Sequence, residues 1–183
     1  DFSGFAFGGD VGIRATDQLD LVLGAMYGRA GARSDYHDLV DQDDLPIVQD
    51  TRLTRVPLTA RLRFYLVPRG RAIGSFAWVP STVVPYLGAG AGAMYHRFEQ
   101  EGSFVDEFDP ELPIYDDVLL QSSGWSPLAQ VLGGIEIALG PRIALMTEGR
   151  YLWSSADLDL DFEDYEPIDL AGFQATAGLS FRF

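Results

Sequence analysis

Apolar and polar residues alternate along this chain with a period of two, and that pattern limits what the chain can fold into. From Val56 to Leu66 every even-numbered residue is apolar, while the odd-numbered residues between them include Arg61 and Arg63. Successive side chains of a β-strand point to opposite faces of a sheet, so the segment predicts a strand with one apolar and one polar face. Two arginines on one face suit a soluble core poorly. They suit the polar interior of a barrel whose outer face meets lipid.

The same alternation recurs in seven segments, which we predict to be strands. They are residues 4–14, 19–30, 52–67, 83–97, 123–139, 142–155 and 168–183. Short connections at 15–18 and 140–141 alternate with long segments on the other side, which is typical of barrels in bacterial outer membranes. The sequence therefore predicts one all-β domain over residues 1–183, folded as an up-and-down antiparallel transmembrane β-barrel.

The number of predicted strands is odd, whereas single-chain bacterial barrels have an even number. We therefore expect eight strands in the complete protein, with one strand missing upstream of this sequence. That strand would pair with the open edge at residues 4–14. The alternative is that another chain supplies it.

Acidic residues are concentrated in three segments, 31–50, 97–122 and 156–169. We predict these segments to be solvated loops on one side of the barrel. The formal net charge of −14 argues against a nucleic-acid binder, which needs a basic face toward phosphate. On the opposite side the connection 68–82 is long, and we expect its Phe76 and Trp78 to lie along a membrane interface.

The last predicted strand ends in a pattern made by Thr176, Gly178, Phe181 and Phe183: a polar residue, a glycine two positions later, and a terminal aromatic residue. This pattern resembles the terminal assembly signal of bacterial outer-membrane proteins, and the whole chain resembles the small barrels of the OmpA, OmpX and OmpW type. The resemblance implies a location in the bacterial outer membrane, extracellular acidic loops and a periplasmic C-terminus. It also implies contact with the lipid bilayer, lipopolysaccharide and the outer-membrane assembly machinery.

An eight-stranded barrel is only wide enough for its own side chains, so we expect a filled interior. The charged residues predicted to point inward are Asp10, Asp20, Arg61, Arg63, Glu136, Glu148 and Arg150. Because unpaired buried charges are costly, these residues should form a structural salt-bridge network. The alternative interpretation is a gate for a small solute. Gly88, Gly90 and Gly92 should make room for the arginines of the neighbouring strand.

A second candidate site is an extended acidic segment whose four carboxylates, those of Asp157, Asp159, Asp161 and Glu163, share one face. Hard cations such as Ca²⁺ take carboxylate oxygens, but the spacing does not match the glycine-containing calcium loop. We therefore interpret the segment as a solvated strand extension. Weak Ca²⁺ binding, or divalent bridging to lipopolysaccharide phosphates, is the alternative; no other cofactor or metal is predicted.

For function, the sequence favours a non-enzymatic outer-membrane protein with a structural or surface-interaction role. The first alternative is an OmpW-like passage for small hydrophobic solutes, with an opening near Tyr95 and His96. The second is a lipid-modifying enzyme that uses His96 with Ser122 or Ser123, although no nucleophile motif surrounds either serine. A soluble lipocalin-like binding barrel is the rival fold. Self-association, or contact with another envelope protein, stays open.

Overall fold

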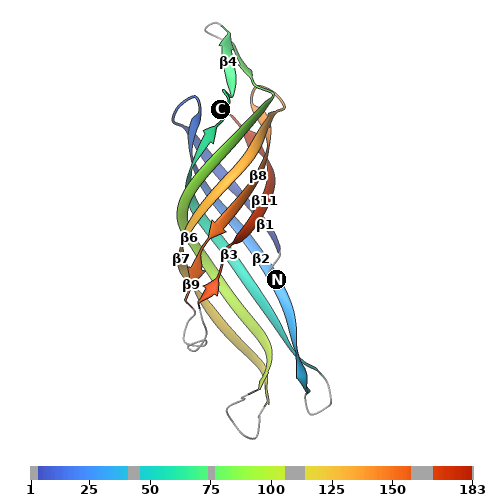
Figure 1. Cartoon of the computed structure of the whole chain (residues 1–183). Coiled ribbons are helices and arrows are strands. Elements are labelled where there is room, and N and C mark those ends of the chain that lie inside the picture. The colour runs from blue at the N-terminus through green and yellow to red at the C-terminus, as the bar shows by residue number, and fades with distance from the viewer. Residues whose placement is uncertain (1–3, 41–45, 74–76, 106–113, 158–166, 183) are drawn as a thin grey trace.

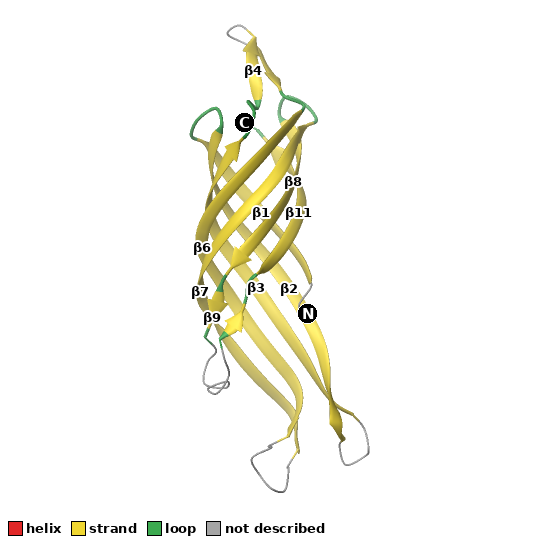
Figure 2. Cartoon of the chain, in the orientation of Figure 1, coloured by secondary structure: helices red, strands yellow, loops and turns green. Residues whose placement is uncertain are grey.

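The computed structural model describes residues 4–40, 46–73, 77–105, 114–157 and 167–182, and all regular secondary structure in these residues is β-strand. One antiparallel sheet has the strand order β1-β2-β3-β6-β7-β8-β11. Its strands are β1 (Gly4–Arg14), β2 (Leu19–Val40), β3 (Pro46–Tyr65), β6 (Val83–Val105), β7 (Ile114–Ala138), β8 (Ile143–Trp153) and β11 (Gly172–Phe181). The sheet curls into a half-barrel (Figures 1 and 2). The predicted all-β fold with a seven-stranded antiparallel sheet is confirmed. Among the described residues, no helix is long and apolar enough to cross a membrane.

The two ends of the sheet differ in length and shape. We call the end that carries the connections 15–18 and 139–142 the turn end. At the opposite end, the loop end, β2, β3, β6 and β7 extend together as long ribbons beyond the other strands, and β3 and β6 stay paired as far as Gln49 and Gly102 (Figure 1). Short strands β9 (Ser155–Ala156) and β10 (Ile168–Asp169) form a small separate pair there.

These ribbons correct the predicted loops. The acidic segments 31–50 and 97–122 were predicted to be loops, but most of their described residues continue as paired strands. The reason is that backbone pairing does not require an apolar face, because cross-strand side-chain pairs can stabilise a polar ribbon. Arg52 Nη1 lies 3.4 Å from Glu101 Oε2 across β3 and β6, and Gln100 Nε2 donates to Gln49 Oε1 at 2.6 Å.

The connection 68–82 also differs from the prediction. It forms a β-hairpin of β4 (Gly70–Ile73) and β5 (Ala77–Pro80), which projects beyond the turn end next to the end of β11 (Figure 1). Trp78 lines the interior cavity and lies under the guanidinium of Arg182, with 5.2 Å from the guanidinium carbon to the ring centroid. Its place along a membrane interface stays a prediction. Phe76 lies outside the described residues.

The two faces of the curled sheet have opposite chemistry, as the alternation predicted. Inward positions are buried, and many are polar or charged: Asp20, Thr59, Arg61, Arg63, His96, Ser126, Gln130, Glu136, Glu148 and Arg150. Outward positions are exposed and apolar, among them Leu21, Leu23, Leu58, Leu62, Phe64, Leu87, Trp125 and Val131. A sheet of a water-soluble protein shows the reverse, with its apolar face buried and its polar face in water.

The interior is layered along its length. Near the loop end, the loop-side cluster packs six buried residues together: Leu53, Met94, Leu128, Leu152, Ala156 and Leu170. Near the turn end, a second cluster contains Tyr65, Val84, Tyr86 and Leu132. On β3 the buried Arg61 and Arg63 lie between Leu53 and Tyr65, so a charged layer separates the two clusters.

Candidate functional site

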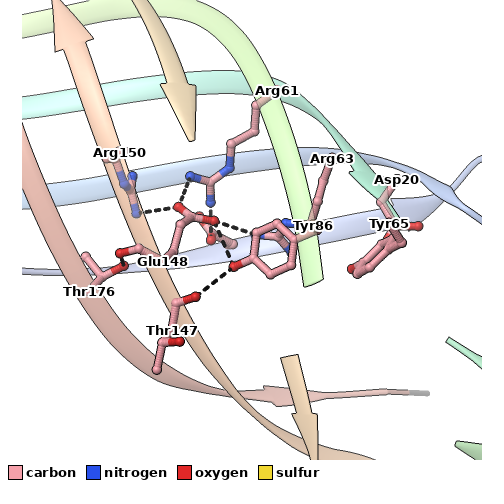
Figure 3. A network of polar contacts seen from close by, with 10 residues as sticks. Asp20, Arg61, Arg63, Tyr65, Tyr86, Thr147, Glu148, Arg150 and Thr176 are labelled. Carbon is pink, nitrogen blue, oxygen red and sulfur yellow. Dashed lines mark hydrogen bonds and ion pairs between the residues drawn. The ribbon is translucent and has the colours of Figure 1, made fainter. Parts of the chain in front are cut away.

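The charged layer is organised around one carboxylate, that of Glu148 on β8 (Figure 3). Its Oε1 accepts a hydrogen bond from Arg61 Nη1 at 3.2 Å and lies 3.1 Å from Arg150 Nη2. Its Oε2 accepts hydrogen bonds from Arg63 Nη2 at 3.2 Å and from the Tyr86 hydroxyl at 3.1 Å. Glu148 is only 7% exposed, so all of these contacts lie inside the half-barrel. We call these residues, together with Asp10, the Glu148 network.

Strand alternation supplies the members of this network in pairs. Arg61 and Arg63 are two residues apart on β3, and Glu148 and Arg150 are two residues apart on β8, so each pair points inward. In the sheet, β6 and β7 separate β3 from β8, so long arginine side chains must reach across the curl. The network therefore depends on the curvature of the sheet and on what lies between the two strands.

Glycines on β6 provide the space that the arginines cross. Gly90 is the register partner of Arg61, and Gly88 is the partner of Arg63. A Cβ atom at Gly90 would lie 2.5 Å from both the Ala60 carbonyl oxygen and the Arg61 Cβ. At Gly88 and Gly92 the nearest atom to such a Cβ is also a carbonyl oxygen of β3, at 2.5 Å for Gly88 and closer still for Gly92. A larger residue at any of these positions would therefore push β3 away, and at Gly90 it would also displace the base of the Arg61 side chain.

Asp10 extends the network to the edge strand β1. Its carboxylate pairs with Nη2 of Arg61, whose side chain is completely buried, while the Asp10 side chain is 36% exposed. Three arginines and two carboxylates thus meet in one layer. Burial of charges costs desolvation energy, which is recovered only when every charge keeps its partners. The layer is a set of mutually dependent ion pairs, in which Glu148 has the most partners.

The other two predicted interior acids form separate pairs at the turn end. Asp20 Oδ2 accepts from Arg69 Nη1 at 2.8 Å and from the Tyr65 hydroxyl at 3.1 Å. Glu136 pairs with Arg182. The seven predicted residues therefore divide into five members of the Glu148 network and two acids with partners of their own.

Sequence reasoning missed several partners. Tyr65 and Tyr86 occupy inward positions of alternating strands, so the period-two pattern could have identified them as neighbours of the charged residues. Arg182 continues the inward positions of the last strand but was left out of the predicted network. Arg69 lies in the connection after β3, which has no periodicity, so nothing in the sequence pointed to its pairing with Asp20.

Aromatic rings lie against three of the interior arginines. Arg63 lies over Tyr86 with 4.6 Å from its guanidinium carbon to the ring centroid, and Arg69 lies over Tyr65 at 4.4 Å. Arg182 lies over Trp78 at 5.2 Å. Guanidinium groups stack favourably on aromatic faces, so these rings hold the arginine side chains in place and fill space that water would otherwise take.

A cavity of about 940 Å³ lies beside the network, and both edge strands, β1 and β11, contribute to its lining. Asp10, Glu148 and Arg150 border it from the network, and Trp78 and Arg182 border it at the turn end. The interior is therefore filled on the side of β3, β6 and β7 and hollow on the side of the two edges.

The residues considered for catalysis do not share one accessible place. His96 and Ser122 are buried inward residues on β6 and β7, with 2% and 1% exposure. Ser123 follows Ser122 on the same strand and so faces outward. Gly124 is the register partner of His96, and a Cβ there would lie 3.3 Å from the imidazole Cε1. In the described residues, His96 therefore has no open site beside it that could admit the substrate of a lipid-modifying enzyme.

The remaining predicted sites fall partly outside the described residues. Asp157 is exposed near β9, whereas Asp159, Asp161 and Glu163 lie outside the described residues. Within the described residues, no group of three His, Cys, Asp or Glu side chains is placed to hold a metal ion.

The C-terminal pattern lies mostly on β11. The Thr176 hydroxyl donates to the Glu148 carbonyl oxygen at 3.4 Å, and Phe181 is exposed on the outer face. A Cβ atom at Gly178 would meet no atom within 4 Å. Phe183 lies outside the described residues.

No protein-family model, no curated protein and no solved structure matches this chain. The functional argument therefore rests on the geometry of the half-barrel and its charged interior.

Proposed function

We propose that this protein is an integral β-barrel protein of a bacterial outer membrane, with a structural or surface-interaction role and no enzymatic activity. The observation that carries the proposal is the inverted sheet: its outward face exposes leucine, phenylalanine and tryptophan, while its inward face buries arginine and glutamate. In water, an outward apolar face of this extent would drive aggregation. Against lipid chains, the same face is the stable arrangement.

Aromatic pairs on the outer face support a membrane setting. Phe7 and Tyr27 are register partners on β1 and β2, and their rings lie 5.5 Å apart. Tyr95 and Trp125 are register partners on β6 and β7, also with 5.5 Å between ring centroids. Tyrosine and tryptophan gather where apolar chains meet the polar headgroups of a membrane. Such paired rings suit the rim of the apolar band nearest the acidic ribbons.

The interior supports a scaffold rather than a wide pore. The Glu148 network crosses the middle of the half-barrel, and the loop-side cluster packs above it with buried leucine and methionine side chains. On the filled side of the interior, ions would have to displace charge pairs and then pass an apolar layer. We therefore propose that the barrel holds its acidic ribbons, oriented to the cell exterior, for interaction with the surroundings.

A heat-modifiability gel tests the proposal most directly. The protein is folded in detergent and run with and without boiling. We expect a compact, faster band in the unboiled sample, which requires detergent for its formation, together with no stepwise conductance in planar bilayers. A protein that stays soluble and folded without detergent, and shows no band shift, would overturn the membrane proposal.

One observation favours a second candidate function, the passage of small hydrophobic solutes. The loop half of the interior is filled by the packed side chains of Leu53, Met94, Leu128 and Leu152, an environment that suits an apolar solute better than an ion. The discriminating experiment is uptake of a small hydrophobic dye into liposomes that contain the protein. Uptake that stops when Leu128 is replaced by Trp would favour passage, whereas uptake equal to that of empty liposomes would leave the scaffold role.

A further inference from the structure

The two edge strands of the sheet lack a neighbour that the other strands have. Every residue of β1 is exposed, including those at inward positions, whereas the inward positions of the central strands are largely buried. Outward aromatic residues on the edges are also more exposed: Phe5 is 97% and Phe173 is 71% exposed, compared with 52% for Leu62 on the inner strand β3. Both edges have unpaired backbone groups that would pair with another strand.

The directions of the edges define what can fill the space between them. β1 runs from the loop end, where Gly4 pairs with Ala30, to the turn at 15–18. β11 also runs toward the turn end, where the Arg182 N–H donates to the Arg142 carbonyl oxygen at 2.9 Å. The two edges are therefore parallel to each other and cannot form the antiparallel ladder found between all the other neighbours. One strand that runs from the turn end to the loop end would be antiparallel to both.

A second copy of the chain fits this space less well. In a membrane, two copies must share the same orientation, so any symmetry axis runs along the barrel. That axis would bring β11 of the second copy beside β1, and those edges again run in the same direction. A single strand of opposite direction satisfies both edges at once.

The cavity beside the edges indicates the chemistry of the missing strand. Its lining carries six arginines but only four carboxylates, although the whole chain has a formal net charge of −14. Two buried guanidinium atoms of lining residues, Arg150 Nε and Arg182 Nη1, have no hydrogen-bond partner among the described residues. An inward carboxylate from a further strand would balance the excess arginine charge and accept hydrogen bonds from these guanidinium groups.

The turn end indicates from which side such a strand is connected. There, Arg182 at the close of β11 pairs with Glu136, lies against Trp78, and bonds to the Arg142 carbonyl. The end of β11 is therefore already held by β5, β7 and the 139–142 connection, which favours a strand that enters from another part of the chain. A strand that enters at the turn end and leaves at the loop end arrives beside Gly4, the first residue of β1.

We propose that one further strand of the same polypeptide, located N-terminal to Asp1, occupies the space between β1 and β11. It runs antiparallel to both edges, has apolar residues facing outward, and places at least one aspartate or glutamate toward Arg150 or Arg182. With it the half-barrel closes as an eight-stranded barrel. The fit of an antiparallel strand rests on the two edges of the sheet, whereas the exclusion of a second copy also rests on the proposed membrane setting.

The first test is the N-terminal sequence and intact mass of the protein isolated from its native cells. We expect a chain that extends upstream of Asp1 by at least the 9 to 11 or so residues of a membrane-spanning strand. That extension should alternate between apolar and polar residues and carry an acidic residue at a polar position. A mature protein that begins at Asp1, or whose extra strand follows Phe183, overturns the inference.

The second test measures the separation of the two edges in that full-length protein. Residues 1–183 contain no cysteine, so cysteine pairs can be introduced at chosen positions. Val11→Cys is combined with Ala177→Cys or with Leu179→Cys, all at outward positions. One intervening strand holds the edges about 10 Å apart, which is twice the interstrand spacing and beyond the roughly 7 Å limit for a disulfide. We expect no disulfide on oxidation in either variant, and cross-linking by a bis-maleimide with a spacer of about that length.

The matched control is Leu23→Cys with Ala60→Cys, because these residues are register partners on β2 and β3. This pair should form a disulfide under the same conditions. Disulfide formation between β1 and β11 at the level of this control would mean that the edges pair directly, which overturns the inference. The cross-linking result is independent of the heat-modifiability gel, so failure of the membrane proposal and failure of the further strand are distinguishable.

Discussion

Two layers of the same interior are built from the same strands but on different principles. The Glu148 network consists of three arginines, two carboxylates and a tyrosine hydroxyl, while the loop-side cluster consists of leucine, methionine and alanine side chains. In the cluster, each contact contributes by area and shape, so a small change is tolerated. In the network, loss of one partner leaves other charges buried without compensation. The difference teaches that one polarity pattern can produce both a tolerant layer and an intolerant one.

The largest effect is expected from removal of the central carboxylate. Glu148→Ala leaves Arg61, Arg63 and Arg150 together without their shared acceptor, and we expect the free energy of unfolding to fall by about 3–5 kcal/mol. Urea unfolding in detergent measures it. The control is Glu101→Ala, because Glu101 is an exposed residue that pairs with the similarly exposed Arg52; it should cost at most about 1 kcal/mol. Equal losses in the two variants would refute the special role of Glu148.

A smaller loss is expected where the network meets its glycine. Gly90→Val places a branched side chain against the Arg61 Cβ and the Ala60 carbonyl oxygen, and overpacking of this kind costs about 1–3 kcal/mol. Gly31→Val on β2 is the matched control, since a Cβ there has only ordinary contact, 3.5 Å from the Thr51 carbonyl oxygen. Unfolding of both variants in urea should show a loss for Gly90 alone. If Gly31→Val were as damaging, the space for Arg61 would not be the cause.

Two volume-conserving changes sharpen the comparison between the layers. Leu128→Met in the loop-side cluster should lower the free energy of unfolding by less than about 1.5 kcal/mol, because the two side chains fill similar volumes. Glu148→Gln also keeps the volume but removes the charge that three arginines share. We expect Glu148→Gln to be the more destabilising of the two variants in the same urea titration. A reversed order would contradict the idea that the charged layer is less tolerant of substitution than the apolar one.

The smallest effect is expected on the exposed ribbon. The Arg52–Glu101 pair is about half exposed on both sides, with 47% and 57% of the side chains accessible. A double-mutant cycle with Arg52→Ala and Glu101→Ala should give a coupling energy of about 0.2–1 kcal/mol. Because screening weakens exposed pairs, the coupling should vanish near 1 M salt, where the Debye length is about 3 Å. A coupling that survives such salt would indicate a buried pair.

Much of the sheet was predictable because the alternation is a local signal. Leu23, Leu58 and Leu62 face outward, and Arg61 and Glu148 face inward, as parity alone indicates. The ends of the strands were not predictable in the same way. In β2 and β6 the polarity pattern fades beyond the apolar band, while backbone pairing continues, so hydropathy placed the loops too early.

The candidate site was predictable in its members more than in its pairing. The parity of each strand predicted all seven charged residues to face inward, and five of them meet at Glu148. Parity did not show that Asp20 and Glu136 would instead pair with Arg69 and Arg182. Those pairings depend on how far the sheet curls and where the β4–β5 hairpin sits. Neither is encoded in a period-two pattern, because both arise from contacts between distant segments.

The length of the ribbons has a consequence for how the protein meets charged molecules. β6 has 23 residues, whereas a tilted strand needs only about 9–11 to cross the hydrocarbon layer. In the proposed orientation, the remaining dozen or so residues, at about 3.3 Å each, carry the ribbon tip roughly 25–30 Å beyond the membrane after allowing for tilt. That distance exceeds the Debye length of about 8 Å at physiological salt. The tip would therefore act on an approaching cation or basic protein as an isolated negative charge, electrically separate from the phosphates of the membrane surface below it.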